Sequence, residues 1–239
     1  MNKEHQLERA KSLAVTFLHL PMEKTKFSPI VVQHPFFESA FLMDKQGAFD
    51  ALEDEARYSD YIRNFAKNCI QACGDMESLL ALIRKSYRLT YLLYMVRGKI
   101  VSTKEAGNLL AGQWDVIENL SHDVNVPKGT VLRWIMAADK DKLMDEDELW
   151  KYNTLPDIVT VYRGCRTAGA AKGMSWTLSE DKARWFADRC ALLSSGKGQG
   201  AMVYRAKIKK ENIVGYLDGR GEQEVIVDYS KLSDLELVD

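Results

Sequence analysis

The chain has 239 residues, 46% of them hydrophobic and 28% charged, which provides enough apolar material for one large domain or two small ones and excludes a disordered composition. Its 33 basic and 34 acidic residues give a net charge of -1, so there is no global signal for nucleic acid or an anionic membrane. Without a signal-peptide pattern or a run of roughly 18 apolar residues, we expect a cytoplasmic protein that does not engage a membrane.

The first two thirds of the chain are predicted to be mainly helical. Apolar residues recur every three or four positions from Lys3 to Leu20, and Pro21 ends that helix. The pattern Ser102-Thr103-Lys104-Glu105 is a capping box that should open a helix reaching Leu120. Further helices are expected over residues 48–72 (with an interruption as the alternative), 76–97, 128–138 and 145–152.

The chain changes character after Asn153-Thr154-Leu155-Pro156. Short β-branched and aromatic runs predict strands over residues 159–162, 174–177, 202–208, 213–216, 224–227 and 235–238. One helix is expected over 179–192, followed by a Gly/Ser loop over 194–200. These patterns predict an α+β protein with a helical region over residues 1–152, of unassigned role, and a strand-rich domain over 153–239.

Three short polar motifs lie on predicted strands of the second region. They are Tyr162-Arg163-Gly164 at a strand end, Ser175-Trp176-Thr177 on the next strand, and Glu222-Gln223-Glu224 before the apolar run Val225-Ile226-Val227. Each motif alone is more typical of a solvated or salt-bridged strand position than of a site. Their occurrence together, in this order, makes a functional site the better interpretation.

This order resembles the Arg-Ser-Glu class of mono-ADP-ribosyltransferases. The resemblance covers about Pro156 to Val238 and does not extend to the first 150 residues. It implies a split β-sandwich that binds NAD, the co-substrate, in a cleft between two small sheets. The family's setting implies a bacterial toxin, a toxin–antitoxin system or a phage-related effector.

The resemblance also implies roles for individual residues. Arg163, beside Gly164, is expected to bind the NAD diphosphate, because a planar guanidinium binds phosphate oxygens bidentately. Glu224 is expected to stabilise the oxocarbenium-like transition state that forms when the nicotinamide–ribose bond breaks. Ser175 would hydrogen-bond and orient Glu224. By strand alternation, Thr177 would share the face of Ser175, and Glu222 that of Glu224. The resemblance thus implies that Arg163, Gly164, Ser175 and Thr177 bind the cofactor and that Glu222 and Glu224 are catalytic.

The acceptor is left open by these residues. It is a macromolecule, either protein or RNA/DNA, and Glu222 would position or deprotonate it. Two alternatives remain: an NAD glycohydrolase, which uses water as the acceptor, and a non-catalytic module that binds a partner. The N-terminal helices could select the target, bind an antitoxin or other regulatory protein, or cover the NAD cleft.

Other signals favour structural interpretations. Cys69 and Cys73 lack a second Cys or His pair to complete a metal site, so no metal is expected. Trp176 is expected to pack in the core against the helix over 179–192, although an aromatic of that helix, Trp185 or Phe186, could line the nicotinamide pocket. The alternating residues Arg205, Lys207 and Lys209 form a basic strand face that could contact phosphates or could be an ordinary exposed face.

Overall fold

The computed structural model describes residues 2–26, 28, 30–117, 120, 123–192 and 201–238. The loop expected over 194–200 lies outside the described residues. The chain forms two compact units, an N-terminal unit (Met1–Pro127) and a C-terminal unit (Lys128–Asp239). The boundary expected near residue 153 therefore falls inside the C-terminal unit, because the helices that precede the strands group with the sheet.

The N-terminal unit is built around its first helix, α1 (Lys3–Leu18), which ends close to the expected position. Ala10, Ala14 and Leu18 are fully buried along one side of α1. Tyr91 of helix α4 (Lys85–Arg97) donates its hydroxyl hydrogen bond to the carbonyl of Ala10 at 2.7 Å. The buried side of α1 is therefore held by packing and by a buried polar contact with a helix far along the sequence.

Two hairpins follow α1, and only the second reaches into the residues from 48 onward that were expected to be helical. Strand β1 (Glu23–Lys24) pairs with β2 (Val32–Gln33), and β3 (Phe41–Asp44) pairs with β4 (Gly47–Asp50). Helix α2 (Glu55–Phe65) follows and continues into the π-helix η1 (Ala66–Ile70). The single helix predicted over 48–72 was wrong in its first residues, because the turn at Gly47 adopts a φ of 107° and starts a strand.

The long helix predicted over 76–97 is divided into α3 (Met76–Leu82) and α4. Ile83 and Arg84 are extended between them. Arg84 donates its backbone N–H to Pro35 and its guanidinium to the carbonyls of Val32, His34 and Phe37. This tertiary contact explains the break, since both the backbone and the side chain of Arg84 bind a segment 50 residues earlier.

The capping box predicted at Ser102 is present at the start of helix α5 (Thr103–Ala111), with both reciprocal hydrogen bonds between Ser102 and Glu105. The helix ends at Ala111, earlier than expected, with Gly112 as its C-cap. Among the described residues, no helix is long and apolar enough to cross a membrane.

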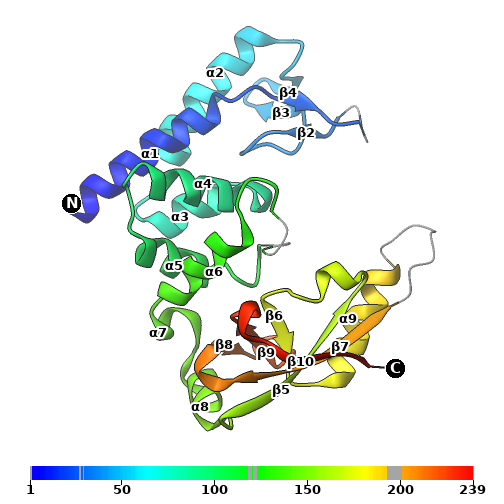
Figure 1. The fold of residues 1–239 in the computed structure, drawn as a ribbon. Helices are drawn as coiled ribbons and strands as arrows, with labels where there is room; N and C mark the ends of the chain where they lie inside the picture. The colour runs from blue at the N-terminus through cyan, green and yellow to red at the C-terminus, as the bar shows by residue number, and fades with distance from the viewer. Residues whose placement is uncertain are drawn as a thin grey trace. The chain divides into compact units, whose positions relative to one another are not determined.

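The C-terminal unit begins with three helices: α6 (Lys128–Ala137), α7 (Lys140–Leu143) and α8 (Glu146–Thr154). A six-stranded antiparallel sheet follows, in the order β10-β7-β5-β6-β9-β8 (Figure 1). Its strands are β5 (Ile158–Cys165), β6 (Ser175–Thr177), β7 (Met202–Lys209), β8 (Ile213–Leu217), β9 (Glu224–Val227) and β10 (Ser233–Val238). Each of the six strands predicted from the sequence is present, and the mixed α and β composition is confirmed.

The sheet consists of two three-stranded halves, β10-β7-β5 and β6-β9-β8. Strand β5 pairs with β7 along its whole length, from Ile158 to Cys165. It meets β6 at the pair Tyr162↔Thr177. Among the described residues, Tyr162↔Thr177 is the one register pair between β5 and β6, and from Arg163 onward β5 is not paired with β6.

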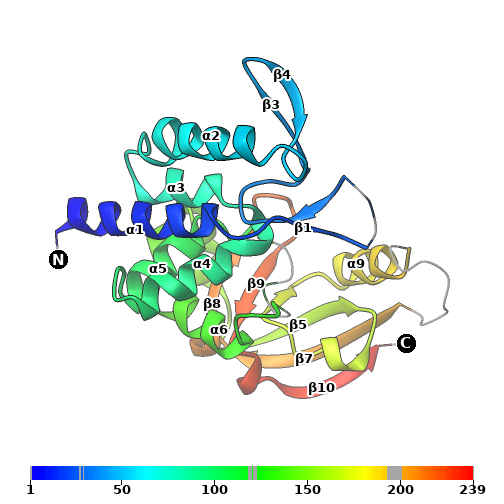
Figure 2. The same ribbon diagram turned by 90° about the horizontal axis from the view of Figure 1, so that it is seen from above.

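Helix α9 (Glu180–Leu192) lies along one face of the β5–β7 half (Figure 2). Its buried residues Ala183 and Ala187 pack against Val203 of β7, with Tyr162 and Val238 at the margin. Ala183 and Ala187 belong to the apolar stripe expected from the spacing of three and four on this helix. The helix thereby fixes the half of the sheet that carries Arg163.

Candidate functional site

The three motifs found in the sequence come together on adjacent strands. Arg163 follows the junction residue Tyr162 on β5, Ser175 lies on β6, and Glu224 is the first residue of β9. Thr177 is the register partner of both Tyr162 and Glu224, so β6 connects the other two motif strands. The candidate site is therefore centred where the two halves of the sheet meet.

The guanidinium of Arg163 spans the divergence between β5 and β6. Its Nε donates to the carbonyl of Ala170 at 2.9 Å, and its Nη1 donates to the carbonyl of Ser175. Gly173 lies directly against it, since a Cβ at this position would overlap the guanidinium. Arg163 thus supplies hydrogen bonds between β5 and β6 beyond the one residue pair at which their backbones are in register.

Electrostatically, the site pairs Arg163 with Glu224. Burial lowers the pKa of the Arg163 guanidinium, while the nearby groups Cys165, Glu224 and Cys190 act to raise it. Arg163 and Glu224 are therefore close enough for their charges to interact, although they come from β5 and β9.

Thr177 has a structural role in this site. It is buried, its Oγ1 donates to the carbonyl of Glu222 at 2.7 Å, and it accepts from the backbone N–H of Ser179 at 3.1 Å. These two contacts fasten the segment before β9 and the start of α9 to β6. The hydroxyl of Thr177 thus already makes two hydrogen bonds within the protein. Its binding to the cofactor stays a prediction.

Glu222 precedes strand β9, which begins at Glu224. Gln223 between them has a φ of 48°, in the left-handed region, and its N–H donates to Asp218 Oδ1 at 3.0 Å. Strand alternation therefore does not apply to Glu222 and Glu224, because Glu222 lies outside β9 and Gln223 between them has a left-handed backbone. The position of Glu222 is set by this turn and by Thr177.

Gly164 allows α9 to approach β5. A Cβ here would overlap the carbonyl of Ala183 and the N–H of Ala187. The contact gives Gly164 a packing role that does not depend on the proposed ligand. The sequence alone indicates only the cofactor-binding role that the resemblance implies for Gly164.

The aromatic residues near the motifs differ in exposure. Trp176 is buried, as expected, and its Nε1 donates to the carbonyl of Gly173 at 2.9 Å. By strand alternation, Trp176 lies on the opposite face of β6 from Thr177, and the register partner of Thr177, Tyr162, packs against α9. This argues against the expected packing of Trp176 on that helix. Trp185 on α9 is half exposed and has the guanidinium of Arg189 5.3 Å from its ring centroid.

Sequence analysis missed Lys128 and Lys172. Lys128 Nζ donates to the carbonyl of Lys172 at 2.6 Å and lies 3.9 Å from the centroid of the Tyr229 ring. Positive charge from Arg163 and Lys172 acts on Lys128, which places these three cations near one another. No local pattern marks Lys128, because it lies 34 positions before the first motif, on a helix predicted to belong to another domain.

The basic face of β7 is neutralised by neighbouring acidic residues. Arg205 pairs with Glu236 at 2.6 Å, Lys207 with Asp234 at 3.1 Å and Lys209 with Glu211 at 3.7 Å. These exposed pairs favour the interpretation of an ordinary strand face over that of a phosphate-binding surface.

A surface depression of about 560 Å³ lies near the start of β5. Its lining residues are Tyr152, Asp157, Ile158, Lys209, Lys210 and Glu211. Ile158 precedes Arg163 by five strand positions, so the depression is about 16 Å from Arg163 at the usual strand rise. It is therefore separate from the candidate site.

Within the described part of the chain, no group of three or more His, Cys, Asp or Glu residues is arranged to hold a metal ion. The four cysteines, Cys69, Cys73, Cys165 and Cys190, are free thiols. No protein-family model matches the chain, and no curated protein or solved structure matches it either.

Proposed function

We propose that the C-terminal unit is a mono-ADP-ribosyltransferase that transfers ADP-ribose from NAD to a macromolecular acceptor and releases nicotinamide. The observation that carries the proposal is the arrangement of Arg163, Ser175 and Glu224 on adjacent strands at the junction of two half-sheets. The residue order that resembles the Arg-Ser-Glu class thus corresponds to one place in the fold. The strands form one six-stranded sheet, and the single residue pair that joins β5 to β6 is compatible with the two small sheets that the resemblance implies.

The residues present fit the chemistry that NAD requires. The cationic groups of Arg163 and Lys128 suit a diphosphate, and the Glu224 carboxylate suits a ribose that acquires positive charge. Glu224 would stabilise that charge while the bond between ribose C1′ and the nicotinamide nitrogen breaks, with its electron pair leaving on nicotinamide. Glu222 would accept the proton of the acceptor nucleophile that bonds to C1′.

A non-catalytic partner-binding module is the second candidate. It is favoured by the hydrogen bonds of Arg163, whose Nε and Nη1 donate to the protein's own carbonyls. If the guanidinium serves only to join β5 and β6, the chain would bind NAD weakly or not at all. NAD glycohydrolysis would use the same residues and differs only in having water as the acceptor.

The decisive experiment compares the wild type with Glu224→Gln in a bacterial lysate that contains labelled NAD. We expect the wild type to label a macromolecule and release nicotinamide, and Glu224→Gln to lose at least about 100-fold of that rate while retaining NAD binding. Glu211→Gln, which changes an exposed carboxylate in the same unit, is the matched control and should keep full activity.

The outcomes separate the alternatives. Label that survives protease and is removed by nuclease identifies RNA or DNA as the acceptor, and the reverse identifies protein. Nicotinamide release with free ADP-ribose and no labelled macromolecule would identify a glycohydrolase. If the wild type neither binds NAD nor turns it over in the presence of the lysate, the non-catalytic alternative is supported.

A further inference from the structure

The segment Ala170–Gly173, which connects β5 to β6, is held by two cationic side chains. Arg163 donates to the carbonyl of Ala170 and lies against Gly173. Lys128, the first residue of α6, donates to the carbonyl of Lys172 at 2.6 Å. The segment therefore brings a guanidinium and an ammonium group from distant parts of the sequence into one neighbourhood.

The ammonium group of Lys128 is fixed in position. It has the Lys172 carbonyl on one side and the Tyr229 ring, with its centroid 3.9 Å away, on another. A cation over an aromatic face is held by electrostatic attraction. These two contacts use one of its three N–H donors for a hydrogen bond and leave the ammonium half-buried and preorganised.

The charges in this neighbourhood repel one another. Burial lowers the pKa of Lys128, and the positive charges of Arg163 and Lys172 lower it further. Grouping like charges costs free energy, and an anion that binds between them offsets this cost. The start of α6 at Lys128 adds the positive end of a helix dipole at the same place.

We propose that Lys128, Lys172 and Arg163 together form a binding site for a phosphate group, with a diphosphate as the preferred ligand. The identity of that ligand rests on the proposed function, under which it is the diphosphate of NAD. The phosphodiester of a nucleic-acid acceptor offers the same chemistry and is the other source. Lys128 and Lys172 are thereby assigned as binding residues that the three sequence motifs do not include.

The test measures binding of inorganic pyrophosphate to the full chain by calorimetry. Lys128→Gln and Lys172→Gln should each weaken binding about tenfold, the usual effect of losing one hydrogen bond to a charged group. Lys128→Arg should retain most of the affinity because it keeps the charge. Lys142→Gln, at an exposed lysine of α7, is the control and should bind as the wild type does.

Lys172→Gln keeps the proposal testable if Lys128→Gln proves unstable. Lys128 donates to the main-chain carbonyl of Lys172, and Lys172→Gln retains this carbonyl. The substitution therefore removes the charge of Lys172 and keeps the contact that orders the segment. Melting temperatures of all variants show whether they are folded. Pyrophosphate binding that is equal in the wild type and in folded Lys172→Gln would overturn the proposal.

The same variants titrated with NAD and with a short single-stranded oligonucleotide identify the source of the phosphate. A loss with NAD supports the dinucleotide, and a loss with the oligonucleotide alone supports the acceptor. If the wild type binds pyrophosphate in a Lys172-dependent manner but does not turn over NAD, the proposed function fails and the phosphate site stands. If NAD is turned over and every variant binds all three ligands equally, the site fails and the function stands.

Discussion

Arg163 has two roles, one in holding the sheet together and one in the candidate site. Its guanidinium joins β5 to β6 through the carbonyls of Ala170 and Ser175, and the negative charge of Glu224 on β9 acts on it. An arginine suits this position because its planar fork donates in several fixed directions, whereas an ammonium group concentrates its donors at one point. A loss of activity in Arg163 variants is therefore informative only when folding is measured alongside it.

We expect Arg163→Lys to destabilise the chain by about 2 to 4 kcal/mol, because one ammonium cannot reach both carbonyls and at least one is left without its donor. Denaturant unfolding measures this change. Arg133→Lys, at an exposed position of α6, is the control and should be neutral within about 0.5 kcal/mol. An Arg163→Lys variant as stable as the wild type would contradict the bridging role that we assign to the guanidinium.

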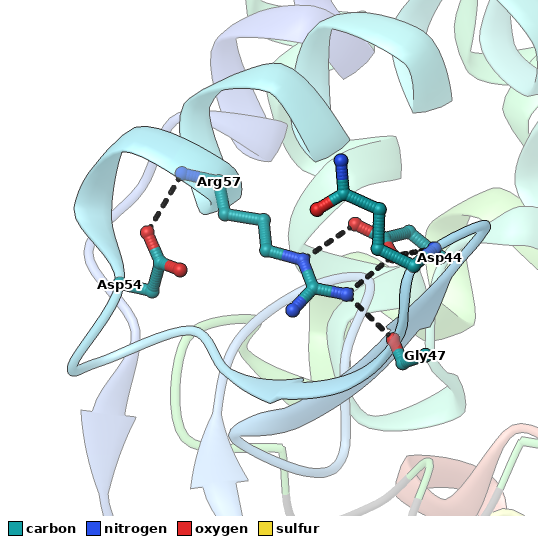
Figure 3. Close-up of polar contacts among 5 residues, drawn as sticks. Asp44, Gly47, Asp54 and Arg57 are labelled. Atoms are coloured by element: carbon teal, nitrogen blue, oxygen red, sulfur yellow. Dashed lines mark hydrogen bonds and ion pairs between the residues drawn. The ribbon is translucent and has the colours of Figure 1, made fainter.

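At the scale of the element, the β3–β4 hairpin depends on one side chain of α2 (Figure 3). Arg57 donates Nε and Nη2 to the two carboxylate oxygens of Asp44 at 2.7 and 2.5 Å, and Nη2 also donates to the carbonyl of Gly47 at 2.8 Å. The guanidinium carbon lies 4.5 Å from the centroid of the Phe49 ring. A two-stranded hairpin is only marginally stable by itself. The contacts of Arg57 stabilise the hairpin by attaching it to α2.

We expect Arg57→Gln to raise the pKa of Asp44 from about 2 toward its ordinary value of 3.8, because hydrogen bonds from Arg57 are the largest cause of the lowered pKa. A lowered carboxyl pKa contributes stability that is present above pH 3.8 and is lost as the pH falls through about 2. Carboxyl resonances followed by NMR against pH measure the change. Arg63→Gln, which breaks the exposed pair with Asp60, should leave the pKa of Asp44 unchanged.

Local patterns in the sequence predicted the C-terminal elements well and the N-terminal interruptions poorly. The six strands and α9 have propensities and periods that act within a few residues, and so does the capping box at Ser102. The break at Arg84 and the hairpin held by Arg57 depend on partners elsewhere in the chain, which periodicity cannot detect. A prediction from helical spacing alone therefore treats α3 and α4 as one helix and starts α2 too early.

The same distinction applies to the candidate site. Arg163, Ser175 and Glu224 were found because each lies in a short motif on a strand, and the sheet brings the three strands together. Glu222 could not be oriented by alternation, since the left-handed backbone at Gln223 is a property of one residue. Lys128 was missed because its contacts with Lys172 and Tyr229 arise only from the fold.

At the scale of the whole molecule, the two compact units differ in their buried titratable groups. The N-terminal unit contains His34, which is fully buried; its Nδ1 accepts from the N–H of Phe36 at 3.1 Å, and its Nε2 lies 3.3 Å from the carbonyl of Leu18. This arrangement suits a neutral ring with its proton on Nε2. Burial lowers the pKa of His34 from 6.5 to about 4, and the positive charge of Arg84 adds to the effect.

The lowered pKa means that the unfolded chain takes up a proton at His34 at a higher pH than the folded chain does. Stability from this group is therefore complete above about pH 6.5, decreases as the pH falls toward about 4, and is constant below that. The full change amounts to about 3 kcal/mol. Because His34 belongs to the N-terminal unit, we expect the loss to be confined to that unit if each unit unfolds by itself.

Native-state hydrogen exchange followed by mass spectrometry at pH 7 and pH 5 tests this expectation. Peptides from α1 and α4 should lose part of their free energy of opening at pH 5, whereas peptides from β5 and β7 should lose less. His34→Gln cannot take up the proton and should abolish the difference between the two units, even if it lowers stability at both pH values. An equal loss in both sets of peptides would mean that the chain unfolds as one cooperative body, because protonation of a single residue would then be felt everywhere.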